Sequence, residues 1–331
     1  MARLVGLGLM ASLLACSPAP APLVESFTPT PIYPAQSIGP VTGGINALAF
    51  APNATIPWEG RILIAPKTGG IIAYSIEGVA GNQVDGPIYT SMATHPGFSL
   101  RGLKTGFVLA VTADGTLVSM IIDDARGQIF TAPVAGLPMS GANGVCALDA
   151  LPGRPKFAIA RQDGSFEQWQ IEDTGADLLQ AKLLGSGQLL APAISCSAAN
   201  GKVFATSASG GMFVIDISDQ PVIERGIDTL QDNLVAIALD DQITYILGSS
   251  TAFAPLNQYD QQLTQTGTLS AVAGLSNPPV EQPGALAITH WSYGGAGFSA
   301  GLLGIADDAN DRVSLIVRDT LPGFINDQEL R

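Results

Sequence analysis

The sequence predicts an all-β fold, a single six-bladed β-propeller. Three observations support this: a recurring hairpin, a short small-residue strand before most hairpins, and a composition rich in turn formers. The hairpin is clearest at residues 157–171, where an apolar strand, the turn dipeptide Asp163-Gly164 and an alternating strand follow one another. The pattern recurs, with weaker copies near the end, at 62–76, 107–122, 203–217, 245–260 and 302–317. The turns repeat roughly every 45–55 residues, a spacing typical of propeller blades.

A second, shorter apolar strand precedes five of these hairpins, and small residues dominate it. These strands are at 45–50, 143–148, 193–198, 234–239 and 284–289. Small side chains suit strands that converge on a narrow centre, so we expect these strands to be the innermost of their blades.

Composition agrees with a closed all-β domain. The chain of 331 residues has 38 glycines and 23 prolines to form turns, and only 13% of its residues are charged. No long amphipathic helical pattern occurs. We therefore expect one propeller over residues 41–320, followed by a C-terminal tail at 321–331.

The N-terminus has the pattern of an export signal. Arg3 is followed by an apolar stretch from Leu4 to Leu14, which is too short to span a bilayer comfortably. The sequence Leu13-Leu14-Ala15-Cys16 resembles the bacterial lipobox, which implies removal of residues 1–15 and attachment of lipid to Cys16. The alternative is an ordinary signal peptide with an incidental cysteine.

The segment after Cys16 is rich in proline, so residues 16–40 are predicted to be a lipid anchor and an extended tether. Ser17, with no aspartate after the cysteine, resembles the pattern of Gram-negative outer-membrane lipoproteins. The expected location is therefore the cell envelope, at the outer membrane, facing the periplasm or the cell surface.

Cys146 and Cys196 occupy matching places in consecutive small-residue strands. An exported compartment permits a disulfide. Neighbouring inner strands around a channel are usually too far apart for one, however. We expect two buried, unpaired cysteines that act as small apolar side chains.

The order of the blade segments resembles the β-propeller phytases, calcium-dependent enzymes that hydrolyse myo-inositol hexakisphosphate. The fragments that carry the resemblance are LIAPKTGGIIAYSIEG, RQDGSFEQWQI, GKVFATSASGGMFVID, YILGSSTAFAPLNQYD, GALAITH and AGLLGIADD. They occur in the family's order and span about residues 43–312. The resemblance implies a six-bladed propeller with calcium ions at its channel mouth, which would collect substrate phosphates and activate water.

The carboxylates that hold these ions in the family are mostly absent. The aligned positions are Ile45-Asn46 in the first blade, Pro192-Ala193 and Thr206-Ser207-Ala208-Ser209 in the fourth, Asp232-Asn233-Leu234-Val235 in the fifth, and Gly284 with Ala287 in the sixth. Two family cations fall on Asp114 and Gln162, and a family tyrosine falls on Asn143.

Three family positions are kept: Lys67 as a substrate-binding candidate, and Asp232 and Asp307 as metal-ligand candidates. Each has a plain alternative, because a lysine can cap a hairpin and an aspartate can accept backbone N–H bonds in a turn. Calcium normally takes six to eight oxygen ligands. We therefore expect calcium binding to be weak or absent, and no catalytic residue is assigned.

Other site chemistry has little support in the sequence. His95 and His290 show no metal-ligand spacing. His290 lies beside Trp291, and we expect it to have a packing or surface role; the alternative is that it lines the channel mouth. A net charge of −13 without a basic cluster disfavours nucleic-acid binding.

Three function classes remain. They are a non-catalytic, ligand-binding lipoprotein of the phytase-like kind, an active phosphomonoester hydrolase with a reduced metal site, and a structural protein of the envelope. A small phosphorylated ligand fits the first two, and we expect a monomer.

Overall fold

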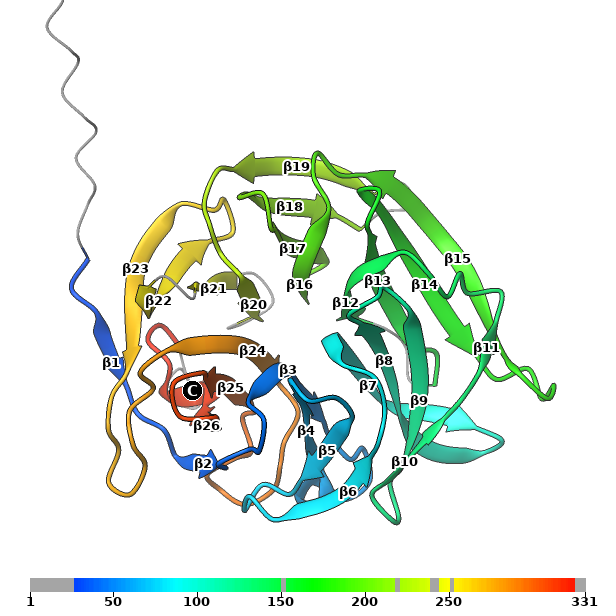
Figure 1. Ribbon diagram of the computed structural model, residues 1–331, viewed down its shortest axis with the longest axis horizontal. Helices are drawn as coiled ribbons and strands as arrows, with labels where there is room; N and C mark the ends of the chain where they lie inside the picture. The colour runs from blue at the N-terminus through cyan, green and yellow to red at the C-terminus, as the bar shows by residue number, and fades with distance from the viewer. Residues whose placement is uncertain (1–26, 150–152, 218–220, 239–243, 251–252, 325–331) are drawn as a thin grey trace, which may run out of the picture.

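The structure is a computed structural model that describes residues 27–149, 153–217, 221–238, 244–250 and 253–324. Its strands form six sheets arranged in a ring around a central axis (Figure 1). This confirms the predicted all-β, six-bladed propeller. In these described ranges, helix is limited to two three-residue turns, η1 (Pro57–Glu59) and η2 (Arg318–Thr320). Among the described residues, no helix has the length and hydropathy needed to cross a bilayer.

The first three blades each run antiparallel from an inner to an outer strand. Blade 1 consists of β3 (Ile45–Ala51), β4 (Arg61–Pro66), β5 (Ile71–Tyr74) and β6 (Ala80–Val84). Blade 2 consists of β7 (Tyr89–Leu100), β8 (Leu103–Thr112), β9 (Leu117–Asp123) and β10 (Gln128–Thr131). Blade 3 consists of β12 (Ala142–Leu148), β13 (Lys156–Arg161), β14 (Ser165–Glu172) and β15 (Leu179–Gln188), with β11 (Val134–Ala135) parallel to its outer edge.

The last three blades follow the same plan. Blade 4 consists of β16 (Ala193–Ala199), β17 (Lys202–Ser207), β18 (Met212–Asp216) and β19 (Val222–Ile227). Blade 5 consists of β20 (Asn233–Ala238), β21 (Thr244–Ser250), β22 (Phe253–Asp260) and β23 (Gln265–Ala271). Blade 6 consists of β24 (Pro283–Thr289), β25 (Leu302–Asp307) and β26 (Arg312–Val317).

Two short N-terminal strands complete the ring. β2 (Gln36–Ile38) is the fourth strand of blade 6, antiparallel to β26, and β1 (Thr30–Ile32) adds to blade 5 parallel to β23. The propeller therefore begins before residue 41, where the sequence analysis placed its start. Prolines at 29, 31 and 34 suggested a tether, but proline is tolerated on edge strands such as these. The proposed signal peptide, Cys16 and residues 325–331 of the tail lie outside the described residues.

The apolar core is divided into six clusters, each between two adjacent blades. Blades 2 and 3, for example, face each other through Phe107 and Phe157, whose ring centroids are 5.6 Å apart. Each sheet is thus covered on both faces by its neighbours. The hairpin strands are accordingly buried along almost their whole length, which explains why their apolar runs were readable in the sequence.

The inner strand of blade 2 was missed by the sequence analysis. β7 contains Pro96 and Gly97, and its pairing with β8 shifts register between His95 and Phe98. This irregularity breaks the period-two pattern that marked the other inner strands.

Hydrogen bonds of polar side chains connect each blade to the next. The six inner strands are all edge strands of their sheets, so they form no ladder with one another. The connecting bonds, in blade order, are Asn46 Nδ2 to Tyr89 O (2.6 Å), Ser91 Oγ to Val145 O (3.3 Å), Asn143 Nδ2 to Ala193 O (2.7 Å), Leu234 N to Ser195 Oγ (3.3 Å), Ser249 Oγ to Gly284 O (2.6 Å) and Tyr293 OH to Arg61 O (3.0 Å).

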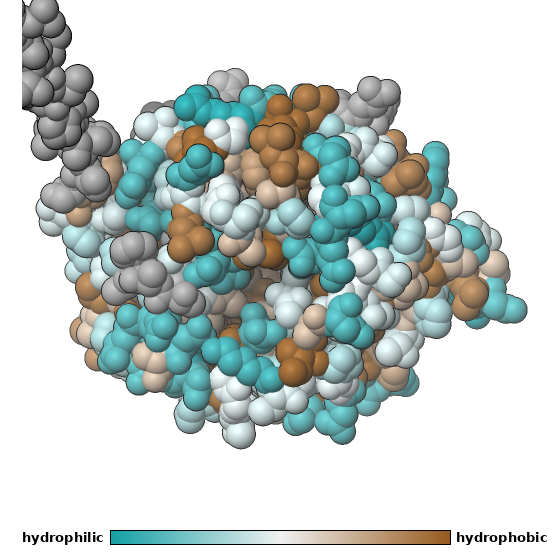
Figure 2. Space-filling view, turned by 45° about the horizontal axis from the view of Figure 1, so that its top comes forward, coloured by the Kyte–Doolittle hydropathy of each residue, from teal (hydrophilic) through white to brown (hydrophobic). Residues whose placement is uncertain are grey.

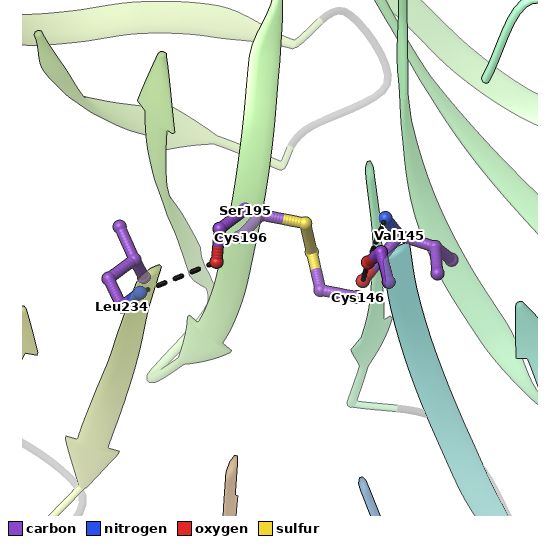
Figure 3. The surroundings of a disulfide bond; sticks show 6 residues. Val145, Cys146, Ser195, Cys196 and Leu234 are labelled. Atoms are coloured by element: carbon purple, nitrogen blue, oxygen red, sulfur yellow. Dashed lines mark hydrogen bonds between the residues drawn. A yellow bond between two sulfur atoms is a disulfide. The ribbon is translucent and has the colours of Figure 1, made fainter. Parts of the chain in front are cut away.

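Cys146 and Cys196 form a disulfide, which overturns the prediction of two unpaired cysteines. The bond joins β12 to β16, beside the hydrogen bond between Ser195 and Leu234 (Figure 3). The two Cα atoms are 5.6 Å apart, within the usual range for a disulfide. Gly144 explains the close approach, since a Cβ there would lie only 3.0 Å from the carbonyl oxygen of Ile194.

The disulfide should contribute measurably to stability, because it closes a loop of 50 residues between two blades. Replacing both Cys146 and Cys196 by alanine should lower the free energy of unfolding by about 2–4 kcal/mol. Chemical denaturation would measure this. As a control, a reductant should destabilise the parent to a similar extent and leave the stability of the double variant unchanged. If the reductant did not change the stability of the parent, the pairing would be contradicted.

Candidate functional site

The six inner strands enclose a cavity of about 1070 Å³ on the ring axis. Its middle is lined largely by small or apolar side chains, among them Ala49, Ala93, Ala147, Ala236 and Ala287. A volume of this size accommodates a small organic ligand. The small residues that identified the inner strands in the sequence are therefore also what keeps the centre open.

The two ends of the cavity differ in chemistry. At the end where the inner strands begin, the polar lining residues are uncharged and include Asn46, Ser91 and Ser195, which bond to the next blade. At the end where the strands finish lie all the titratable side chains among the described lining residues: His95, Lys104, Asp149, His290 and Arg318. Trp291 is at this end as well. We call this second end the histidine mouth.

The histidine mouth brings together residues from distant parts of the chain. His95 lies in β7, next to its register shift. Asp149 follows β12, His290 follows β24, and Arg318 begins η2. Both histidines of the chain thus face one opening. From the sequence, the pair showed no metal-ligand spacing, and a packing or surface role was expected for His290. A separation of 195 positions gives no local signal of their meeting; His290 beside Trp291 at a strand end was the one usable clue.

Electrostatics keeps both histidines neutral near pH 7. Desolvation lowers the pKa of His95, and the neighbouring His290 lowers it further, while the bond to Pro96 O (3.0 Å) and Asp149 oppose the change. The pKa of His290 is lowered by desolvation and by Arg318, against an opposite effect of Asp149. The side chains of His95, Asp149, His290 and Arg318 therefore influence one another electrostatically across the opening. Acidification would protonate the histidines and add positive charge to the opening.

The residues predicted from the phytase resemblance lie at the other end of the ring. Lys67 follows β4, Asp307 ends β25 and Asp232 precedes β20, all on the face where the inner strands begin. None of the three lines the cavity. Lys67 is exposed and pairs with Asp308 at 3.5 Å, and the half-buried Asp232 donates its backbone N–H to Ser249 O.

Asp307 is a structural carboxylate in this arrangement. It is wholly buried, and its Oδ1 accepts the backbone N–H groups of Glu281 and Gln282 at 3.3 and 3.1 Å. Its Oδ2 accepts bonds from Asn310 and from the Arg312 guanidinium, at 2.9 and 3.2 Å. Both oxygens are therefore engaged by the protein itself. Within the described ranges, no three His, Cys, Asp or Glu side chains form a group that could hold a metal ion.

Several positions that align with the phytase site serve here to join blades. Asn46 and Asn143 donate to the carbonyls of Tyr89 and Ala193, and the carbonyl of Gly284 accepts from Ser249. In the fourth-blade hairpin, the Oγ atoms of Ser207 and Ser209 bond to each other at 2.9 Å. The absence of acids at Asn46, Gly284 and the two serines, and of a tyrosine at Asn143, could be predicted from the sequence, but the bonds of Asn46, Asn143 and Gly284 between blades could not.

Most of the molecular surface in view is polar. Figure 2 shows teal and white residues over much of the face, with brown residues in several separate groups. Exposed apolar side chains such as Leu190 and Leu275 come from loops between blades.

Comparison with known proteins supports the fold. No family model and no curated protein matches the sequence. Among solved structures, the chain is similar to BBS1N in complex with ARL6DN, in crystals soaked with lead (11% identity, 85% of this chain and 81% of that chain, TM-score 0.50). A second structure of that complex, soaked with mercury, shares 10% identity over 88% of this chain and 98% of the other, again with a TM-score of 0.50. At such low identity the likeness shows the propeller fold alone.

Proposed function

We propose that this chain is an exported lipoprotein whose phytase-like propeller binds a small molecule in its central channel and does not hydrolyse it. The observation that carries the proposal is that positions aligned with the phytase site join neighbouring blades in this protein. Asn46 and Gly284 stand where the family has metal-binding acids; neither carries a carboxylate, and both are engaged in bonds between blades.

Calcium chemistry argues in the same direction. A calcium site needs six to eight oxygen ligands, several of them carboxylates, and the family mechanism needs more than one ion. Of the two candidate acids, Asp307 already has both oxygens bonded within the protein, and Asp232 lies on the next blade. Without bridging ions, inositol hexakisphosphate would meet a protein of net charge −13. Hydrolysis of the family kind is therefore not expected.

The channel supplies the alternative to catalysis. It offers an enclosed volume with apolar walls and charged groups at one end, which is the usual make-up of a small-molecule site. The disulfide between blades 3 and 4 fits an exported protein, because such bonds persist in oxidising compartments. An active phosphomonoester hydrolase with a reduced metal site is the competing function, and the next experiment separates the two.

The protein should show no calcium-dependent release of phosphate from inositol hexakisphosphate above background. Calcium should also raise its melting temperature little, because a site with two acids at most would bind the ion at about millimolar strength. Both measurements use the same preparation, with and without a chelator. Robust turnover that the chelator abolishes would overturn the proposal and would mean that other acids, such as Asp114 or Asp308, have rebuilt a metal site.

Membrane attachment should depend on Cys16. Replacing Cys16 by serine removes the sulfur to which lipid would be attached, so the variant should leave the membrane fraction or remain unprocessed. Stable anchoring needs more than one acyl chain, as bacterial lipoproteins have. Because the variant would lack this lipid anchor, its loss from the membrane fraction should be nearly complete. Fractionation of cells that express the parent and the variant would measure it. Equal membrane recovery of the two proteins would reject lipidation.

A further inference from the structure

The central cavity is polarised from end to end. Its titratable lining groups lie at the histidine mouth, and its wall further in is formed by alanines and other apolar side chains of the inner strands. A ligand that fills such a cavity must itself be polar at one end and apolar along its body. The sign of the charge at the mouth then decides which polar head it takes.

Arg318 provides the fixed positive charge. It donates from Nη1 to the Ala238 carbonyl at 3.2 Å, and the ring of Phe324 lies 5.1 Å from its Cζ. Its Nε is buried and has no hydrogen-bond partner among the described residues. Arg318 lines the cavity, so an anionic oxygen there would interact with a guanidinium whose hydrogen bonds the described residues satisfy only in part.

The surroundings of Arg318 favour the same ligand. His95 and His290 face the mouth as neutral rings that become cations on acidification, and Lys104 adds an exposed positive charge. Asp149 is the opposing acid among the lining residues. Behind Arg318 lie Asp319 and the buried phenol of Tyr245, whose pKa burial raises, so the phenol stays neutral. Among the described lining residues, Lys104 and Arg318 outnumber Asp149, so their balance of charge is positive although the whole protein is strongly acidic.

Trp291 gives the mouth an apolar element. Its side chain is 38% exposed, and its ring centroid is 5.9 Å from that of His290, with the two planes inclined by 33°. If the apolar body of a ligand lay between this ring and the alanine-lined wall, its whole length would be removed from contact with water. Each buried methylene then contributes about 0.8 kcal/mol.

We propose that the channel binds an amphipathic organic anion, with its acidic head at Arg318 and the histidines and its apolar body along the small-residue wall. This inference rests on the proposed function, because it names the ligand class of the same channel. The histidine mouth then recognises the anionic head, and Lys67, Asp232 and Asp307 make no contact with the ligand.

The test compares three probes by titration calorimetry on the full chain carrying Cys16→Ser, so that no lipid or detergent competes. Octanesulfonate has both the head and the body, octanol lacks the charge, and methanesulfonate lacks the body. Octanesulfonate should bind at least about 10-fold more tightly than octanol and about 100-fold more tightly than methanesulfonate. Arg318→Gln should weaken octanesulfonate about 10-fold or more.

Arg126→Gln is the matched control, since Arg126 lies between β9 and β10, does not line the cavity and has a side chain that is 72% exposed. It should leave octanesulfonate binding unchanged. Affinity for the sulfonate, which stays ionised, should also rise as the pH falls below the ordinary histidine pKa of about 6.5 and the histidines gain protons. The probe series and the pH series need no substitution at Arg318, so they hold even if Arg318→Gln fails to fold.

Equal binding of octanol and octanesulfonate, or an octanesulfonate affinity that Arg318→Gln does not change, would overturn the inference. So would failure of octanesulfonate to bind at millimolar concentration. If inositol hexakisphosphate alone bound, in a way that required Arg318, the amphipathic class would be wrong while the proposed binding function stood. Calcium-dependent hydrolysis of that compound would instead reject the proposed function, so the two failures are distinguishable.

Discussion

Closure of the ring is the constraint on which the rest of the molecule depends. Each inner strand is an edge strand of its sheet and pairs with no strand of another blade. The six blades therefore stay together through apolar contacts between faces, through side-chain bonds and through the return of β2 to blade 6. Ile38 in β2 is buried against blade 6, so the last sheet is completed by the start of the chain. A propeller closed in this way leaves little room for any blade to move alone.

Because the ring must stay closed, one end of the channel is used to hold the blades together, and the other end is left for ligand recognition. At the end where the inner strands begin, Asn46, Asn143 and Ser195 hold neighbouring blades together. The disulfide reinforces the same region between blades 3 and 4. At the opposite end, the described lining residues include the charged groups, and of these Arg318 has an unpartnered N–H. Ligand recognition is therefore expected at the histidine mouth and not where the phytase resemblance would place it.

The sequence was informative wherever one residue type repeated at a fixed place in each blade. The hairpins and five inner strands could be located because buried strands and turn glycines leave a local pattern. β1, β2 and β7 could not. β1 and β2 have only three residues each, and proline, glycine and a register shift interrupt the pattern in β7.

The candidate site was harder to predict for a physical reason. His95, Asp149, His290 and Arg318 meet only because the ring brings the ends of distant strands together, and no spacing in the chain reports such a meeting. The disulfide was missed on the same ground, since the close approach of β12 and β16 depends on Gly144.

The most direct measurement restores a family acid at a position that the structure uses between blades. In Asn46→Asp, an ionised carboxylate would face the Tyr89 carbonyl and could not donate to it. The free energy of unfolding should fall by about 1–3 kcal/mol, and calcium should not recover it. Asn82→Asp is the control, because Asn82 accepts a bond from Ile129 N at 3.2 Å and aspartate can still accept it. Calcium binding that stabilises Asn46→Asp beyond the parent would contradict the account.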